Sequence, residues 1–124
     1  MDINYIKSNL EMSNFYFSNF SFERKKYISD GRYSIDVEKH IEKYDMHKYH
    51  IALKTYIGKD DIMLNVVAEA DFLFSSSVNI DEESIIERNA IAIMFPFIRS
   101  QVTLMTSQPG MIPIVLPTIN TAKL

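Results

Sequence analysis

Apolar and polar residues alternate along much of the first half of the chain, which is the pattern of strands that bury one face. The first run is aromatic and consists of Phe15, Phe17, Phe20 and Phe22. Its register shifts at Ser18-Asn19. We therefore expect a strand at about 12–24 that contains a bulge.

Two more alternating runs and one continuous apolar run follow the first strand. They predict strands at about 33–45, 47–58 and 62–75. Asp30-Gly31 gives a turn signal before them, and a second one stands at 58–61. Because short turns join antiparallel neighbours, the last three strands should form a meander.

A long helix is expected at about 81–107. Asn79 and Glu82 have the spacing of a capping arrangement, and Asp81, Glu82 and Glu83 place negative charge where the helix dipole favours it. Pro96 lies inside and should kink the helix. The predicted fold is a single α+β domain over 1–124: a four-stranded antiparallel sheet with a long kinked helix and an apolar C-terminal segment, 108–124, packed on one side.

The helix carries two apolar stripes. One consists of Ile86, Ala90, Ile93, Phe97 and Leu104, and the other of Ile91, Met94, Phe95, Ile98, Val102 and Met105. A helix packed on one sheet needs only one stripe. We therefore predict an oligomer interface formed by Ile91, Met94, Phe95, Ile98 and Val102. In the alternative, the segment after Pro109 folds back over that stripe within one chain.

Composition narrows the class of protein. The chain has 124 residues, 47% of them hydrophobic and 23% charged, as in one globular domain. A net charge of -3 gives no basic footprint for nucleic acid. No cysteine is present, which excludes a disulfide and a thiol nucleophile. The N-terminus lacks signal-peptide features, and the longest uncharged apolar run is about half the ~20 residues of a membrane span, so we expect a cytoplasmic protein without membrane insertion.

The titratable residues do not form a recognisable catalytic or metal site. His40, His47 and His50 are interpreted as solvated strand histidines, because the spacing of the last two puts their side chains on opposite faces. The acidic pair Asp60-Asp61 falls at a turn. Glycines are isolated and no Gly-x-Ser-x-Gly sequence occurs. We expect no enzyme, no metal and no cofactor.

The helix and tail carry a motif that extends from about 84 to 120. It comprises Met94-Phe95-Pro96-Phe97-Ile98-Arg99, Thr103, Met105, Ser107, Gly110, Pro113, Leu116, Pro117 and Asn120. This stretch resembles SecB, the bacterial export chaperone. Its tail is similar to those of divergent SecB-like proteins, some of which serve toxin–antitoxin systems.

The resemblance implies an ATP-independent chaperone that holds unfolded or partly folded polypeptides, in protein export or as the dedicated chaperone of an antitoxin. It also implies a homotetramer, a dimer of dimers paired through the long helix. By position, the client-binding residues would be Phe20, Phe22, Tyr27, Ile28, Phe72, Phe74, Met105, Met111, Ile112 and Leu116.

Two departures from SecB bear on its partner, the translocation motor SecA. The sequence stops at Leu124, where SecB carries a mobile extension. The acidic sheet-face positions that SecB uses for SecA align with Asn19, Glu23 and Asn65. Both departures leave SecA a doubtful partner.

A different class of function is also compatible with the sequence. A small oligomeric α+β protein could enclose an apolar small ligand between sheet and helix, even as an enzyme. This alternative predicts saturable binding of a small molecule and no suppression of aggregation.

Overall fold

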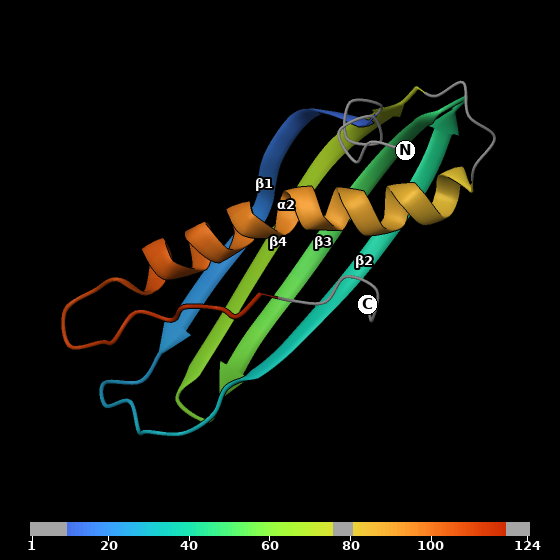
Figure 1. The fold of residues 1–124 in the computed structure, drawn as a ribbon. Helices are drawn as coiled ribbons and strands as arrows, with labels where there is room; N and C mark the ends of the chain where they lie inside the picture. Colours follow the sequence, from blue (N-terminus) through green and yellow to red (C-terminus); the bar gives the residue numbers. More distant parts are fainter. Residues whose placement is uncertain (1–9, 76–80, 119–124) are drawn as a thin grey trace.

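A long helix crosses one face of a four-stranded antiparallel sheet in a computed structural model, which describes residues 10–75 and 81–118 (Figure 1). The strands are β1 (Leu10–Arg24), β2 (Ser34–Asp45), β3 (Lys48–Lys59) and β4 (Ile62–Phe74), and the helix is α2 (Glu82–Thr106). The strand order is β1-β4-β3-β2, with every neighbouring pair antiparallel. The predicted α+β fold and its meander are confirmed.

The core lies between the sheet and α2. Along β4, Leu64, Val66 and Ala68 are buried, whereas Met63 between two core positions is 61% exposed. Ile57 of β3 pairs with Leu64, so the buried faces of neighbouring strands coincide. Alternation of side chains across a strand thus gives the sheet one apolar face for the helix and one face that points away from it.

Two bulges shape β1. Its pairing with β4 shifts between Phe17 and Asn19, as the sequence predicts, and again between Ser13 and Tyr16. Asn14, at the second shift, has a positive φ of 54°, a conformation that asparagine tolerates better than most residues. The bulges let Phe17 and Phe20 both pair with core-facing positions of β4 although their spacing is odd.

The cap of α2 differs from the expected one. Asp81 is the N-cap, and its carboxylate accepts a hydrogen bond of 3.4 Å from the Ser84 backbone N–H. Asn79, the residue predicted for this role, lies outside the described residues. The helix continues through Pro96 to Thr106. In the described part of the chain, no helix has the length and apolar character to span a bilayer.

The structure corrects the predicted oligomer interface. Its five residues are at most 3% exposed and face the sheet; they are Ile91, Met94, Phe95, Ile98 and Val102. The large apolar residues that α2 exposes are instead Ile93, Phe97 and Leu104, at 37%, 48% and 69%. The interface prediction is wrong at these positions because the pattern contains two stripes and does not say which one meets the sheet.

The chain turns back after α2. Residues 111–118 follow the helix in the opposite direction (Figure 1), and Ile114 and Leu116 enter the core cluster that contains Ile98 and Val102. The alternative interpretation of the apolar tail, in which it folds back within one chain, is therefore the one that the structure shows.

Candidate functional site

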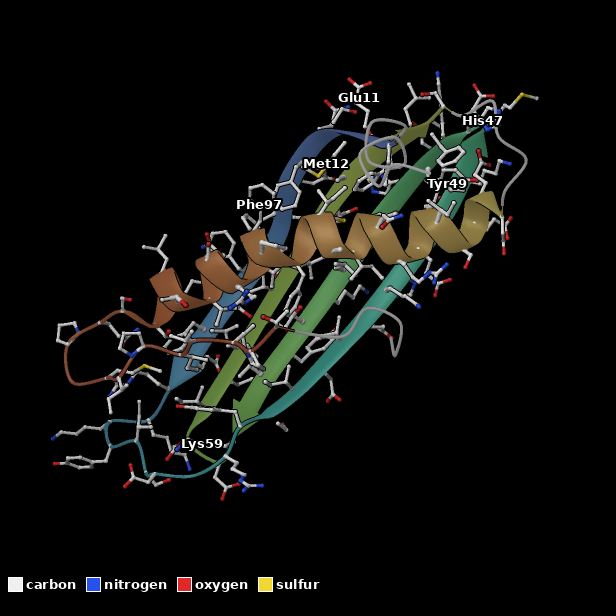
Figure 2. The ribbon with its side chains drawn as sticks, viewed as in Figure 1. Glu11, Met12, His47, Tyr49, Lys59 and Phe97 are labelled. Atoms are coloured by element: carbon white, nitrogen blue, oxygen red, sulfur yellow. The ribbon has the colours of Figure 1, made fainter. Side chains whose placement is uncertain are left out.

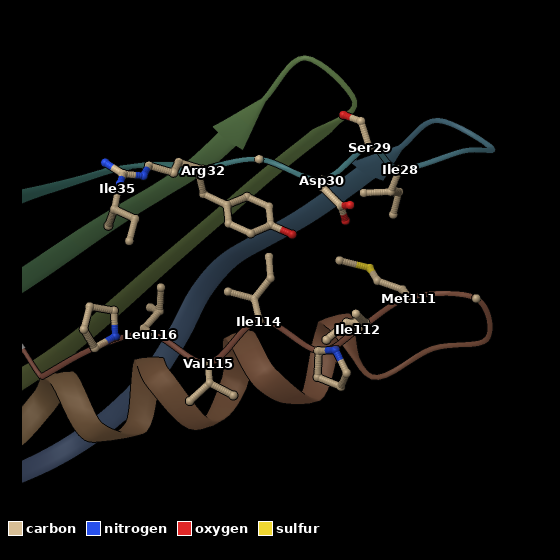
Figure 3. Close-up of a pocket in the computed structure, with 15 residues that line it drawn as sticks. Ile28, Ser29, Asp30, Arg32, Ile35, Met111, Ile112, Ile114, Val115 and Leu116 are labelled. Carbon is tan, nitrogen blue, oxygen red and sulfur yellow. The ribbon is translucent and has the colours of Figure 1, made fainter.

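An open groove of about 600 Å³ lies between two irregular segments that are distant in sequence (Figure 3). One wall is the crossover segment, residues 25–33 between β1 and β2. The other is the return segment, residues 108–118 after α2. Residues 28–33, Ile35 and residues 110–117 line the groove.

Hydrogen bonds from the helix fix the return segment. The Thr106 hydroxyl accepts from the Ile114 N–H at 2.8 Å, and the Thr103 hydroxyl donates to the Ile114 carbonyl at 2.8 Å. Arg99 Nε donates to the Leu116 carbonyl at 3.0 Å. Arg99 and Thr103 belong to the SecB-like motif, so two motif positions have a defined task here: they hold the groove wall against α2.

The return segment presents apolar side chains to solvent. Ile112 is 85% exposed and Val115 is 73% exposed, whereas Ile114 and Leu116 between and beside them are buried. Each large apolar side chain left in water forgoes about 1.5–3 kcal/mol of burial free energy. Exposed apolar side chains on a segment that is fixed in place beside a groove are typical of a surface that binds another apolar molecule.

The crossover segment is fixed by the turn between β3 and β4. The Asp61 carboxylate, 8% exposed, accepts 2.7 Å hydrogen bonds from both the backbone N–H and the hydroxyl of Ser29. These bonds and the nearby Lys59 ammonium lower the pKa of Asp61 to about 2. Lys59 also donates to the Ser29 carbonyl and lies 5.3 Å from the Tyr33 ring centroid. The predicted turn at Asp60-Asp61 is present, but its two carboxylates differ: Asp60 is exposed, whereas Asp61 is buried.

The rim of the groove carries one charge of each sign. Asp30 and Arg32 are exposed, and neither side chain has a hydrogen bond or ion pair to another described residue. Figure 3 shows Met111 and Ile114 on one wall and Ile28 and Asp30 on the facing wall. The groove is thus apolar along its walls and polar at its rim. The residues that line it do not place a nucleophile beside a general base and a general acid.

The structure brings together only part of the predicted client-binding set. Those that line the groove are Ile28, Met111, Ile112 and Leu116. Tyr27 is adjacent in sequence and 79% exposed. Phe20 is 54% exposed on β1, while Phe22 and Met105 are partly buried against the core.

Phe72 and Phe74 do not belong to the groove. Both are buried, and the Phe74 ring lies 6.4 Å from the His47 ring, at the end of the sheet where α2 begins. Their prediction as client-binding residues is wrong, because β4 buries its even-numbered positions under α2. Groove residues that the sequence did not single out include Tyr33, Ile35 and Val115. Tyr33 and Ile35 belong to an alternating run that predicts only a strand, so the sequence gives no sign that they line a groove.

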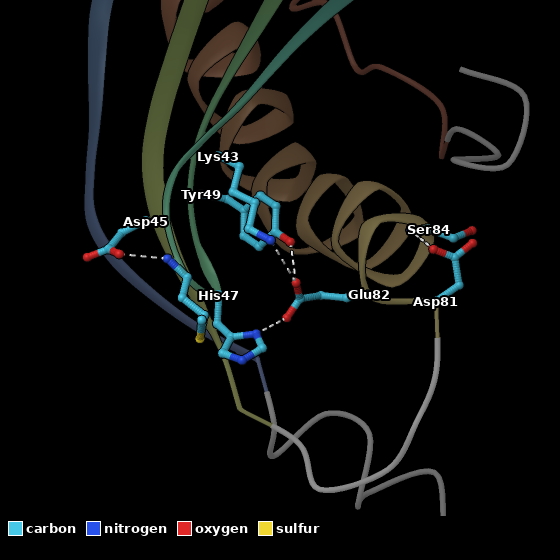
Figure 4. A network of polar contacts seen from close by, with 8 residues as sticks. Lys43, Asp45, His47, Tyr49, Asp81, Glu82 and Ser84 are labelled. Atoms are coloured by element: carbon cyan, nitrogen blue, oxygen red, sulfur yellow. Dashed lines mark hydrogen bonds and ion pairs between the residues drawn. The ribbon is translucent and has the colours of Figure 1, made fainter.

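A polar network joins the start of α2 to the turn between β2 and β3 (Figure 4). Glu82 accepts one hydrogen bond from the Tyr49 hydroxyl and contacts His47 Nδ1, with the Lys43 ammonium 3.7 Å away. Burial and the Glu82 carboxylate raise the pKa of Tyr49. The bonds from Tyr49 and His47 lower the pKa of Glu82 although burial opposes this shift. Figure 2 shows His47 and Tyr49 at the end of the sheet opposite to Lys59, so this network is remote from the groove.

His50 lies on the sheet face that points away from α2. Its two ring nitrogens are 2.8 Å from Glu69 Oε1 and Asp71 Oδ1, and Asn14 donates to Asp71 at 3.0 Å. The two carboxylates raise the pKa of His50, and His50 lowers both of theirs. The prediction of a solvated histidine is therefore wrong for His50, which is partly buried between two carboxylates. His47 is about half exposed, as predicted, although it also contacts Glu82. Among residues 10–75 and 81–118, no cluster of acidic and histidine side chains has the arrangement of a metal site.

Comparison with known proteins gives structural relatives of low sequence identity. The Mycobacterium tuberculosis SecB-like chaperone Rv1957, in complex with a ChAD peptide from the Rv1956 HigA1 antitoxin, matches with a TM-score of 0.73 at 11% identity, over 94% of this chain and 92% of that chain. A protein of unknown function from Streptococcus agalactiae matches with a TM-score of 0.59 at 10% identity, over 88% of this chain and 97% of that chain. No protein-family model and no curated protein sequence matches the chain. The SecB-like fold implied by the motif is confirmed.

Proposed function

We propose that this chain is an ATP-independent chaperone, without enzymatic activity, that holds unfolded or partly folded polypeptides in the groove between the crossover and return segments. The observation that carries the proposal is the return segment: an extended strip that α2 fixes in place while Ile112 and Val115 remain in water. The SecB-like fold supports the same function. A cytoplasmic location follows as part of this proposal.

The groove suits a chain without a fixed sequence. Its walls present aliphatic side chains, a thioether at Met111 and the ring of Tyr33. Such side chains repack around different partners, because dispersion contacts and burial do not require one hydrogen-bonding pattern. The exposed charges of Asp30 and Arg32 keep the rim hydrated beside the apolar trough.

Suppression of aggregation tests the function. We expect the purified protein to slow the aggregation of a chemically denatured model protein, and the double variant Ile112→Ser/Val115→Ser to lose most of this effect. The control Met46→Ser/Met63→Ser removes two exposed apolar side chains that do not line the groove, at 72% and 61% exposure. Equal loss in both variants, or none in either, would contradict the groove assignment. Saturable binding of a small apolar molecule without any suppression would favour a ligand-binding protein.

A narrower role, as the dedicated chaperone of an antitoxin, is supported by one of the comparisons. The structure of Rv1957 that shares this fold contains a peptide of an antitoxin. Co-purification from the native cytosol distinguishes the roles. One small protein encoded by a neighbouring gene would support the antitoxin role, whereas many secretory precursors would support a role in export and reopen the question of SecA.

We further propose that the chain assembles into a homotetramer, a dimer of dimers, through the exposed face of α2. Ile93, Phe97 and Leu104 lie on this face, and the Phe97 ring is 4.9 Å from Phe15 of β1. Together they extend an apolar surface from the helix to the edge strand. Light scattering after size exclusion is expected to give four chains, and Phe97→Glu is expected to reduce that mass. A wild-type monomer at micromolar concentration would contradict the assembly.

A further inference from the structure

The guanidinium of Arg24 joins the two walls of the groove. Arg24 is the last residue of β1, directly before the crossover segment. Its Nε donates to the Lys25 carbonyl and its Nη2 to the Lys26 carbonyl, both at 3.1 Å. Its Nη1 reaches across to the Gln108 side-chain oxygen at 3.2 Å and the Pro109 carbonyl at 3.5 Å. In the part of the chain that the structure describes, no other side chain hydrogen-bonds both walls.

The two walls are otherwise held by different parts of the molecule. Asp61 and Lys59 tie Ser29 to the β3–β4 turn, and the Lys25 N–H donates to the Asp61 carbonyl at 2.9 Å. Thr103 and Thr106 tie Ile114 to α2. Each wall is therefore rigid with respect to its own support, and a link between them fixes the distance across the groove.

Arg24 acts where the return segment begins. The Gln108 carbonyl accepts from the Met111 N–H at 3.2 Å, and Gly110 between them has a φ of +74°, which favours glycine. This turn delivers Met111 to the groove opposite Ile28 (Figure 3). A displacement of Gln108 therefore also moves Met111 at that end of the groove.

We propose that Arg24 is a positioning residue that sets the spacing between the crossover and return segments, and thereby the size of the apolar client side chain that the groove accepts. This inference rests on the proposed chaperone function. All four acceptors of Arg24 are neutral oxygens that lie in several directions, which the planar fork of a guanidinium satisfies at once. A lysine ammonium retains the charge but cannot span the same set.

Spacing is measured first, in the free protein. The chain has no cysteine, so spin labels can be attached specifically at Asp30→Cys and Ile112→Cys, one on each wall. We expect Arg24→Lys to broaden and shift the distance distribution between the labels. Arg88→Lys is the matched control, because among the described residues Arg88 hydrogen-bonds only Ser84, which lies within α2. An unchanged distribution in Arg24→Lys would overturn the inference, whatever the client experiments show.

Selectivity is measured with unstructured peptides that differ only in one central residue, Leu or Phe. We expect the ratio of their two dissociation constants to change about threefold to tenfold in Arg24→Lys. A change of this size corresponds to the typical free energy of one hydrogen bond. Gln108→Ala should change the ratio in the same way and add little in the double variant. Equal weakening of both peptides, with the ratio preserved, would show that Arg24 has no role in size selection. Wild-type protein that binds neither peptide would refute the proposed chaperone function. The distances between the spin labels would still test whether Arg24 sets the spacing between the two walls.

Discussion

The hydroxyl of Thr106 accepts a 2.8 Å hydrogen bond from the buried N–H of Ile114 and donates one of the same length to the Val102 carbonyl. One side chain, fully buried, thus connects the last turn of α2 to the return segment. The wall of the groove depends on this link, because Ile114 also supplies the carbonyl that Thr103 binds.

Thr106→Val should destabilise the protein by about 1–3 kcal/mol, because it leaves the buried N–H of Ile114 without an acceptor at nearly unchanged side-chain volume. Urea unfolding followed by circular dichroism measures this loss. Ser100→Ala on the exposed side of α2 is the control and should change the free energy of unfolding by less than about 0.5 kcal/mol. A Thr106→Val variant as stable as the wild type would show that the link is not made.

Ile98 and Ile93 test the orientation of α2. Ile98 is fully buried, so Ile98→Ala should cost about 2–5 kcal/mol through lost burial and a cavity. Ile93 is 37% exposed, so Ile93→Ala should cost much less under conditions that keep the chain monomeric. A larger loss for Ile93→Ala than for Ile98→Ala, measured by urea unfolding, would restore the face assignment that the sequence predicts.

The strands and the helix could be predicted from sequence because each follows from local spacing. The bulge at Ser18, for example, is visible as a shift in the alternation of aromatic residues. The face of α2 could not be predicted, because Ile86 and Ala90 of one apolar stripe and Ile98 of the other are all buried. That choice depends on where the helix axis lies over the sheet and on the return segment, which takes up part of the second stripe.

The groove was only half predictable for a similar reason. Ile28, Met111 and Ile112 belong to segments that the motif and the apolar tail mark out. The residues that hold those segments are polar and look like ordinary surface residues. Asp61, Arg24 and Thr106 act on partners 32, 84 and 8 positions away, and no local pattern contains such a pairing.

Tyr49→Phe tests the network at the start of α2. Removing the hydroxyl takes one donor from Glu82, which keeps its contact with His47 and the nearby Lys43. We expect a loss of about 1–2 kcal/mol, at the lower end for hydrogen bonds to charged groups because Glu82 is partly exposed. Tyr44→Phe, on a side chain that is 54% exposed and without a described partner, is the control. Because burial and Glu82 raise the pKa of the Tyr49 phenol, the absorbance titration of Tyr49→Phe should also lack a tyrosine that ionises above the usual range.

The triad of His50, Glu69 and Asp71 predicts a pH-dependent contribution to stability. The pKa of His50 is raised above 6.5, so its contribution is complete below that pH and is lost as pH rises through the higher folded value. The pKa values of Glu69 and Asp71 are lowered from 4.5 and 3.8. The two carboxylates therefore contribute stability above these unfolded-state values, and this contribution is lost as pH falls through their lower folded-state pKa values. The triad should therefore stabilise the fold most between about pH 4.5 and 6.5.

Replacement of His50 by glutamine isolates this effect. We expect the difference in unfolding free energy between the wild type and His50→Gln to be largest near pH 5.5 and to shrink toward pH 9, as His50 loses its proton and with it the ion pairs to both carboxylates. His40→Gln is the control, because His40 is 59% exposed and its ion pair, at 3.7 Å, is with the similarly exposed carboxylate of Glu38. Exposed ion pairs of this kind contribute little to stability. A difference for His50→Gln that stays constant from about pH 5 to pH 9 would mean that the imidazole acts in the folded state as a neutral hydrogen-bonding group.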